Sequence, residues 1–367
     1  MRRFFLLPLL TLAVAPAFAE YPLVVLAADQ AGRIDFFDAA LAPLGSVGIG
    51  AGQRIESVAA SPDGRRLYIA KAEDRTADSC GLYSLDLETR GMCPVATPAL
   101  FGAPSPDGRF LFTQGKGGVD VFDASNLVRI STLKAPGAYN LQPSPDGRWL
   151  FGVTNSPQPS LAIFDMASEG TVRRIPLPLG PVTGAWAGDR FYLFNYGGDG
   201  NRGTGWLWSV KAENGELSPA RPIELPDLHG LCNEPVLLTL AGAPDELFLA
   251  EAFGFKVDRR LTCPEAARGG VYLIHPSTGR FIYEAASVRV NRMAASPDGR
   301  DLYVIESGGP RAPGAARLLH INARTGAILH ESALVSGQWS LTLARVPPAL
   351  IARYGPRGHV RATACPR

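Results

Sequence analysis

Polar residues recur in pairs at the start of several short, mostly apolar segments of this 367-residue chain. Arginine, carboxylate, amide and aromatic side chains together can hold a small anionic or sugar-like molecule through charge-assisted and amide hydrogen bonds. The alternative is that they are solvated residues around ordered water. The five pairs, called the mouth residues below, are Arg54 and Glu56, Tyr139 and Asn140, Asn233 and Glu234, Asn291 and Arg292, and Gln338 and Trp339.

A repeated turn sequence explains how pairs so far apart in the chain can meet. Ser-Pro-Asp-Gly-Arg begins at Ser61, Ser105, Ser144 and Ser296, and a short apolar strand follows each copy. Proline presets φ, aspartate bonds the local backbone and glycine accepts positive φ, so each copy predicts a tight turn. With the degenerate copies at 187–190 and 243–246, the turns recur every 39 to 56 residues. This spacing is typical of four-stranded propeller blades.

The two ends of the chain complement each other. Residues 23–38 match the middle of a unit without its inner strand, and 339–346 match an inner strand with nothing after it. Pairing them would remove the exposed edges of an open sheet. We therefore predict an all-β fold, a seven-bladed β-propeller of four-stranded antiparallel blades, with the ring closed by N-terminal strands pairing with a C-terminal inner strand. The units begin near residues 23, 66, 110, 149, 191, 247 and 301.

The repeat also carries a family resemblance. Ser-Pro-Asp-Gly-Arg-x-Leu-Tyr-Val followed by Val-x-Val-x-Asp resembles the YVTN-type propellers, which are related to lactonase-like propellers and to the propeller subunits of quinoprotein amine dehydrogenases. The resemblance covers essentially the whole mature chain and implies the propeller fold. It leaves two alternatives for function, a lactonase-like hydrolase and a cofactor-free subunit of a periplasmic quinoprotein or cytochrome dehydrogenase complex. The repeated aspartates and arginines are expected to form turns.

The first 19 residues have the features of a secretory signal peptide. Arg2 and Arg3 precede a short apolar stretch, and Ala17-Phe18-Ala19 is a small-x-small cleavage site. We expect a signal peptide at 1–19, the propeller at 20–346 and a C-terminal tail at 347–367, with a periplasmic or secreted location and no membrane span in the mature chain. The basic tail is expected to be largely solvated, with a course along a blade or toward a partner as the alternative. A net charge of +2 argues against nucleic-acid binding.

Propeller topology assigns the loops to two faces. The short turns lie on one face, and the variable loops and the connections between blades lie on the other. Irregular loops on a rigid scaffold commonly carry binding sites, so we expect the functional surface on the loop-rich face. The mouth residues begin their inner strands on that face and should converge on a central funnel. The variable loops are 71–80, 154–160, 195–204, 251–270 and 306–315.

Five cysteines in an exported chain suggest disulfides. Cys232 and Cys263 belong to the same unit and the same face, so they are the expected pair. A hairpin near 88–91 puts Cys93 opposite about Leu85, which argues against a Cys80–Cys93 bond. Cys93 with Cys365 is an alternative, and one cysteine should be left over.

No catalytic motif matches residue by residue. Glu56, Glu234 or Glu251 could act as a general base beside an arginine, but no Gly-x-Ser-x-Gly sequence or phosphate loop is present. His229, Cys232 and Glu234 are too few for a convincing metal site, so we expect neither metal nor cofactor. The leading interpretation is an exported, non-catalytic propeller that binds a small molecule or a periplasmic protein partner on its loop-rich face and funnel.

Overall fold

The computed structural model describes nineteen stretches of the chain. They are residues 21–29, 31–50, 53–72, 80–99, 101–115, 117–154, 159–168, 171–177, 182–196, 204–211, 221–224, 235–243, 246–253, 271–274, 281–286, 290–306, 316–334, 338–354 and 358–362.

The strands form consecutive antiparallel sheets in chain order. The first contains β1 (Leu23–Asp29), β2 (Arg33–Phe37) and β3 (Pro43–Gly48), together with β28 (Gln338–Arg345) from the far end of the chain. The second contains β4 (Arg54–Ala60), β5 (Arg66–Ala72), β6 (Cys80–Asp86) and β7 (Gly91–Ala96). The third contains β8 (Gly102–Pro104), β9 (Phe110–Gly115), β10 (Gly118–Asp123) and β11 (Arg129–Leu133).

The sheets that follow repeat this arrangement. The next is β12 (Ala138–Pro143), β13 (Trp149–Thr154), β14 (Ser160–Asp165) and β15 (Thr171–Pro176), and then come β16 (Val182–Ala187), β17 (Arg190–Tyr196), β18 (Thr204–Lys211) and β19 (Arg221–Glu224). The remaining two are β20 (Pro235–Ala243), β21 (Glu246–Phe253), β22 (Val271–Ile274) and β23 (Phe281–Ala286), and β24 (Val290–Ala295), β25 (Asp301–Glu306), β26 (Ala316–Asn322) and β27 (Ile328–Leu334).

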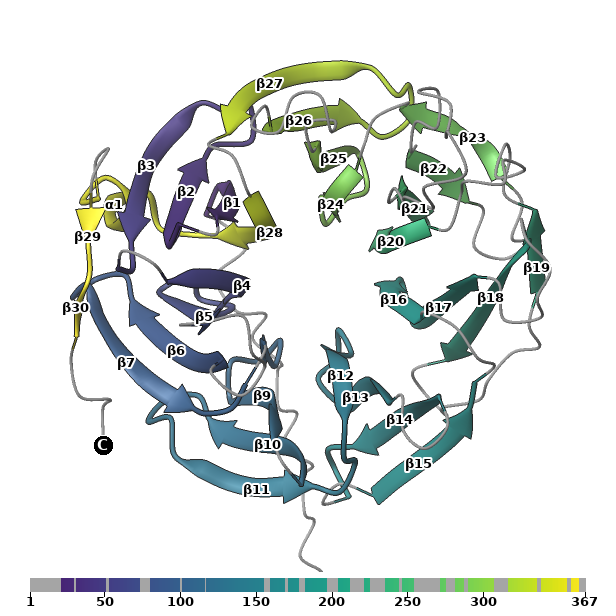
Figure 1. Ribbon diagram of the computed structural model, residues 1–367, viewed down its shortest axis with the longest axis horizontal. Coiled ribbons are helices and arrows are strands. Elements are labelled where there is room, and N and C mark those ends of the chain that lie inside the picture. The colour runs from purple at the N-terminus through teal and green to yellow at the C-terminus, as the bar shows by residue number, and fades with distance from the viewer. Residues whose placement is uncertain are drawn as a thin grey trace, which may run out of the picture.

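The sheets stand around a common centre, with β4, β12, β16, β20, β24 and β28 nearest to it (Figure 1). The expected propeller of four-stranded antiparallel blades is confirmed. β1 pairs antiparallel with β28 from Leu23 opposite Arg345 to Asp29 opposite Gln338. The two ends of the chain therefore share one sheet.

The four turns have one hydrogen-bond pattern. The serine Oγ donates to the aspartate Oδ1 two residues on, as from Ser61 to Asp63 at 2.6 Å, and it accepts the backbone N–H of Arg66 at 2.9 Å. The same bonds recur in the turns that begin at Ser105, Ser144 and Ser296. The turn glycines have φ between +65° and +71°. The expectation that these aspartates form turns is confirmed.

Apolar side chains pack between neighbouring sheets. One cluster joins Leu26 and Ile34 of the first sheet to Leu67 and Ile69 of the second, and all four are at most 1% exposed. Two polar side chains of β28 add hydrogen bonds across this seam. Ser340 Oγ accepts the Val58 N–H at 3.0 Å, and Thr342 Oγ1 donates to the Val58 carbonyl at 2.5 Å. The first and second blades are thus held together by both apolar and polar contacts.

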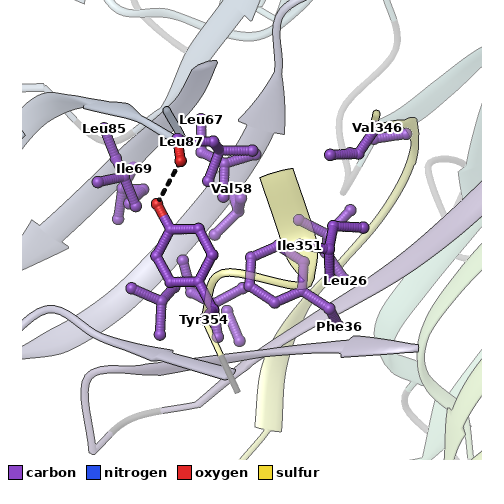
Figure 2. Close-up of a cluster of buried hydrophobic side chains, with 14 of the residues drawn as sticks. Leu26, Phe36, Val58, Leu67, Ile69, Leu85, Leu87, Val346, Ile351 and Tyr354 are labelled. Carbon is purple, nitrogen blue, oxygen red and sulfur yellow. Dashed lines mark hydrogen bonds between the residues drawn. The ribbon is translucent and has the colours of Figure 1, made fainter. Parts of the chain in front are cut away.

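The C-terminal tail packs over the seam between the first two blades. α1 (Pro348–Ile351) buries Leu350 and Ile351 in the same apolar cluster. Tyr354 is 3% exposed and its hydroxyl donates to the Leu87 carbonyl at 3.1 Å, as Figure 2 shows. The expectation of a solvated tail is therefore wrong for this part, because its apolar side chains fill a gap that two blades share.

Beyond Tyr354 the tail reaches the outer rim. β29 (Gly358–His359) pairs parallel with β3, and β30 (Arg361–Ala362) pairs parallel with β7. One short segment thus extends two adjacent sheets, each by one strand (Figure 1). We call residues 347–362 the strap.

Asp35 on β2 gives a pH-dependent prediction for stability. Burial raises the pKa of this carboxyl group, the Arg33 side chain partly opposes the shift with a 2.6 Å hydrogen bond, and the charge of Asp29 adds to it. A raised pKa means that the folded state binds the proton more tightly than the unfolded state. Asp35 therefore lowers the free energy of unfolding as pH rises through the unfolded pKa, about 3.9, and on to the higher folded pKa.

We expect Asp35→Asn to raise the urea midpoint at pH 7 and to change it less at pH 3, since Asp35 is protonated there in both states. Urea unfolding at the two pH values measures this difference. Asp189→Asn, at an exposed turn position, is the matched control. A midpoint gain that is equal at both pH values would contradict the assignment.

Candidate functional site

The mouth residues in the described part of the chain all lie at the same end of their inner strands. Arg54 and Glu56 begin β4, Tyr139 and Asn140 begin β12, and Asn291 and Arg292 lie at the start of β24. Gln338 and Trp339 begin β28. Each of these strands runs from this end toward a turn or toward the strap. The sequence-based expectation that the pairs occupy equivalent positions therefore agrees with the strand boundaries.

A β-bulge interrupts the same part of five inner strands. Ile55 pairs with Lys71 and Ser57 with Ala70, so Glu56 is an extra residue in β4. Asn291 in β24, Trp339 in β28 and Val236 in β20 are extra residues in the same way. In β12, two residues, Asn140 and Leu141, lie opposite the single residue Gly152 of β13, since Tyr139 pairs with Val153 and Gln142 with Phe151. Bulges re-aim side chains and are common next to active sites.

The core confirms the effect of these bulges on side-chain direction. Ile55 and Val58 belong to one apolar cluster, although residues three apart face opposite ways in a regular strand. Ala138 and Leu141 share another cluster, and Val290 and Met293 share a third. Because of the extra residue, the two apolar side chains point to the same side of the sheet. The side chain of the extra residue itself no longer follows the regular alternation of the strand. Glu56 and Asn140 occupy these positions.

An apolar-x-x-apolar spacing at the strand start is the signal that could have found the bulges. It occurs at Ile55–Val58, Ala138–Leu141 and Val290–Met293. Sequence reasoning identified the polar residues inside this spacing but missed the bulges themselves. The bulges are the structural reason that polar residues can occupy the start of a strand whose flanks are buried.

Three charged mouth residues form an electrostatic group. Arg54 donates through Nε to Glu56 Oε1, and their side chains are 33% and 23% exposed. Burial lowers the pKa of Arg292, and the negative charge of Glu56 partly restores it. Glu56 is on β4 and Arg292 is on β24, whereas β28 contacts both strands and lies between them (Figure 1). The negative charge of Glu56 therefore acts on Arg292 across the inner strand of the blade that lies between them.

Asn140 and its neighbours make a second, uncharged group. Asn140 has φ of +50°, a conformation that asparagine tolerates better than most residues. Its Oδ1 accepts the Gln142 Nε2–H at 3.3 Å. Tyr139 packs against the apolar cluster of the next seam. This group therefore offers amide hydrogen bonds at the site.

Two residues near the mouth were not identified from the sequence. Lys71 on β5 pairs with Ile55, is 9% exposed and lies 4.2 Å from the centre of the Tyr83 ring. Gln114 on β9 projects from the same strand face as Phe112, which packs with Ala138 at the start of β12. Its Oε1 is buried without a hydrogen-bond partner in the described part of the chain. Each is a long polar residue at the next-to-last position of its strand, and this is the signal that would have found them.

Several predicted site residues lie outside the described residues or are described only by their backbone. Asn233, Glu234, Cys232 and Cys263 lie outside them, so their roles stay predictions. For Asn291, Gln338 and Trp339 the structure gives the strand position alone.

The two cysteines in the described part of the chain are on neighbouring strands. Cys80 pairs with Ala72, and Cys93 pairs with Ser84 rather than with Leu85. The register therefore places Cys93 several residues along the ladder from Cys80, as expected, and no disulfide bond joins the two. The one-residue difference is set by the hairpin turn, since the pairs from Leu85–Met92 to Tyr83–Pro94 share one register and the bulge between Leu82 and Tyr83 lies farther from the turn.

Two features are absent from the described stretches of the chain. Within these stretches, no three histidine, cysteine, aspartate or glutamate side chains gather closely enough to hold a metal ion. In the same stretches, the structure contains no helix with the length and apolar character needed to cross a bilayer.

Comparisons with known proteins give the fold. No protein-family model and no curated protein sequence matches the chain. The chain is similar to the solved structure of Kuenenia stuttgartiensis hydrazine synthase, with 17% identity, a TM-score of 0.52 and coverage of 83% of this chain and 90% of that one. It is also similar to the dihydro-heme d1 dehydrogenase NirN in complex with DHE, with 14% identity, a TM-score of 0.52 and coverage of 89% and 76%.

A third similar structure is a putative 6-phosphogluconolactonase from Bacteroides fragilis. It has 12% identity and a TM-score of 0.56, and the match covers 90% of this chain and 99% of that one. At these identities the three likenesses establish a β-propeller and leave the activity to the site itself.

Proposed function

We propose that this chain is an exported propeller that binds a small anionic or sugar-like molecule at its mouth residues. The observation that carries the proposal is the electrostatic group of Arg54, Glu56 and Arg292, because it draws charged side chains from two blades that are not neighbours. Small-molecule sites commonly combine a few convergent polar groups with a rigid apolar frame. The bulges supply the convergence, and the buried apolar pairs supply the frame.

The location and the ring belong to the same proposal. The signal-like residues 1–19 support export to the periplasm or outside the cell. The strand order of the sheets and the β1–β28 pairing support seven blades and a ring closed between the two ends of the chain. A closed ring would keep the mouth residues at fixed separations, which lowers the entropic cost of binding.

Binding without catalysis is the interpretation that the ion pair favours. Glu56 is engaged by Arg54, so its carboxylate serves as an electrostatic partner in this arrangement rather than as an unengaged general base. The similar structure titled a putative 6-phosphogluconolactonase makes lactones the reaction class to test. Turnover of a lactone by the wild-type chain, lost in Glu56→Gln with folding intact, would replace binding by hydrolysis.

The test is the effect of Arg292→Gln on binding. We expect calorimetric titration of the wild-type chain with a panel of small carboxylates, phosphates and sugars to find a ligand, and Arg292→Gln to weaken it about tenfold or more, since a charge-assisted hydrogen bond to a partly buried guanidinium is lost. Arg129→Gln, at a 62% exposed arginine on the rim strand β11, should leave the affinity unchanged. Arg292→Lys keeps the charge and should give an intermediate affinity. Equal weakening by Arg129→Gln and Arg292→Gln would place binding elsewhere.

A further inference from the structure

We propose that Glu56 is an internal competitor for the ligand, and that the ligand class is a small monocarboxylate whose carboxylate takes the place of the Glu56 carboxylate beside Arg54 and Arg292. This inference rests on the proposed function and names the chemistry of the same site. It makes Glu56 the residue that sets which ligands are accepted and how tightly they bind.

The position of Glu56 on a bulge permits the exchange. Glu56 has no partner in the register of β4 with β5, because Ile55 and Ser57 take the neighbouring partners. Ile55 is fully buried and Val58 is 5% exposed, so the backbone on either side is anchored. The Glu56 side chain can therefore change its rotamer without breaking the ladder or moving the core.

The charges explain why a carboxylate is the fitting group. The Glu56 carboxylate accepts hydrogen bonds from Arg54, and its negative charge acts on Arg292 of a different blade. A carboxylate presents two oxygens to a guanidinium in a geometry that matches its fork of donors. A ligand carboxylate can thus take the hydrogen bonds that Arg54 gives to Glu56 and can act on Arg292 with the same negative charge.

The balance of charge favours a monoanion. When a monocarboxylate replaces Glu56 beside the two arginines, the charge held there stays the same and the displaced Glu56 carboxylate turns toward water. A dianionic phosphate would bring one more negative charge into a site that is only partly exposed, and that charge would be costly without a further cation. A neutral analogue of the ligand would have to displace Glu56 from its ion pair with Arg54, and it has no negative charge to offer the arginine in return.

The experiment compares wild type, Glu56→Gln and Arg54→Gln by calorimetric titration. The probes are sodium lactate, its neutral analogue lactamide, sodium phosphate and glucose. We expect wild type to bind lactate weakly and lactamide not at all, Glu56→Gln to bind lactate about tenfold more tightly, and Arg54→Gln to lose it. Glu331→Gln is the matched control, because Glu331 forms a 2.8 Å ion pair with Arg317 on the outer strands and should leave lactate affinity unchanged.

Each outcome decides the inference. Unchanged or weaker lactate binding in Glu56→Gln overturns it, and so does phosphate binding more tightly than lactate in wild type. Glucose binding that Arg292→Gln weakens, with no lactate binding in wild type or Glu56→Gln, overturns the inference and leaves the proposed function standing. No binding of any probe or panel compound to wild type or Glu56→Gln overturns both. If Glu56→Gln loses its β-sheet circular dichroism, Glu56→Thr gives the same comparison.

Discussion

Gly64→Ala is expected to destabilise the protein by about 4 kcal/mol or more, far beyond the same change in an equivalent turn. Gly64 has φ of +65°, and a Cβ placed there would lie 1.9 Å from the Arg345 carbonyl oxygen and 2.9 Å from the Val346 Cα. Those atoms belong to the last residue of β28 and to the residue that follows it, just before the strap, and backbone inside a packed seam cannot move aside cheaply. Thermal or urea unfolding measures the loss.

The repeat supplies matched controls for this prediction. Gly108 and Gly147 have φ of +71° in identical turns, but the nearest atoms to an added Cβ are proline ring carbons at 3.8 and 4.0 Å. Gly108→Ala and Gly147→Ala should therefore cost only the left-handed backbone strain, about 1–2 kcal/mol. If all three variants lose the same stability, the end of β28 does not lie against the turn of the second blade, and the ring-closing arrangement proposed above would lose its support.

Tyr354→Ala is the second large expected effect, with a loss of about 3–5 kcal/mol in the free energy of unfolding. The ring is 3% exposed, and it packs at 5.9 Å from the Phe36 ring in the cluster between the first two blades (Figure 2). Removing the ring leaves a cavity between the first two blades. It also removes a contact that holds the strap against them. Urea unfolding measures the stability, and limited proteolysis reports whether the strap has been released.

Two further variants separate the contributions of the tyrosine. Tyr354→Phe keeps the ring and removes only the hydrogen bond to the Leu87 carbonyl, which should cost about 1–3 kcal/mol. Leu329→Ala, at a 45% exposed position on the rim strand β27, should change stability by less than about 0.5 kcal/mol. A Tyr354→Ala protein as stable as Leu329→Ala would mean that the strap is not part of the folded core.

The bulges and the charged group illustrate where prediction from the sequence stopped. The sequence placed polar residues at the start of inner strands, because a turn motif with fixed spacing gives the strand boundaries. It did not give the register of β4 against β5, which makes Glu56 an extra residue. Register depends on which apolar side chains of the two strands pack together. The sequence of one strand alone therefore does not determine it.

The strap shows the same limit at the C-terminus. Its arginines suggested a solvated tail, whereas Leu350, Ile351 and Tyr354 are buried against residues of the first and second blades. These three apolar residues have no periodicity that marks a packed element, since α1 is only four residues long. Their burial depends on a gap that exists only once the blades have assembled.

By itself, the sequence determined the repeat, the turns and the start of the inner strands at which the described mouth residues lie. These follow from local chemistry, since a serine, a proline, an aspartate and a glycine within five residues form the turn with their own hydrogen bonds. Only the tertiary structure decided which mouth residues act on one another and where the strap goes. Arg292 and Glu56 are more than 200 residues apart in the chain, and their interaction exists because inter-blade packing, which no local segment encodes, brings β24, β28 and β4 around one centre.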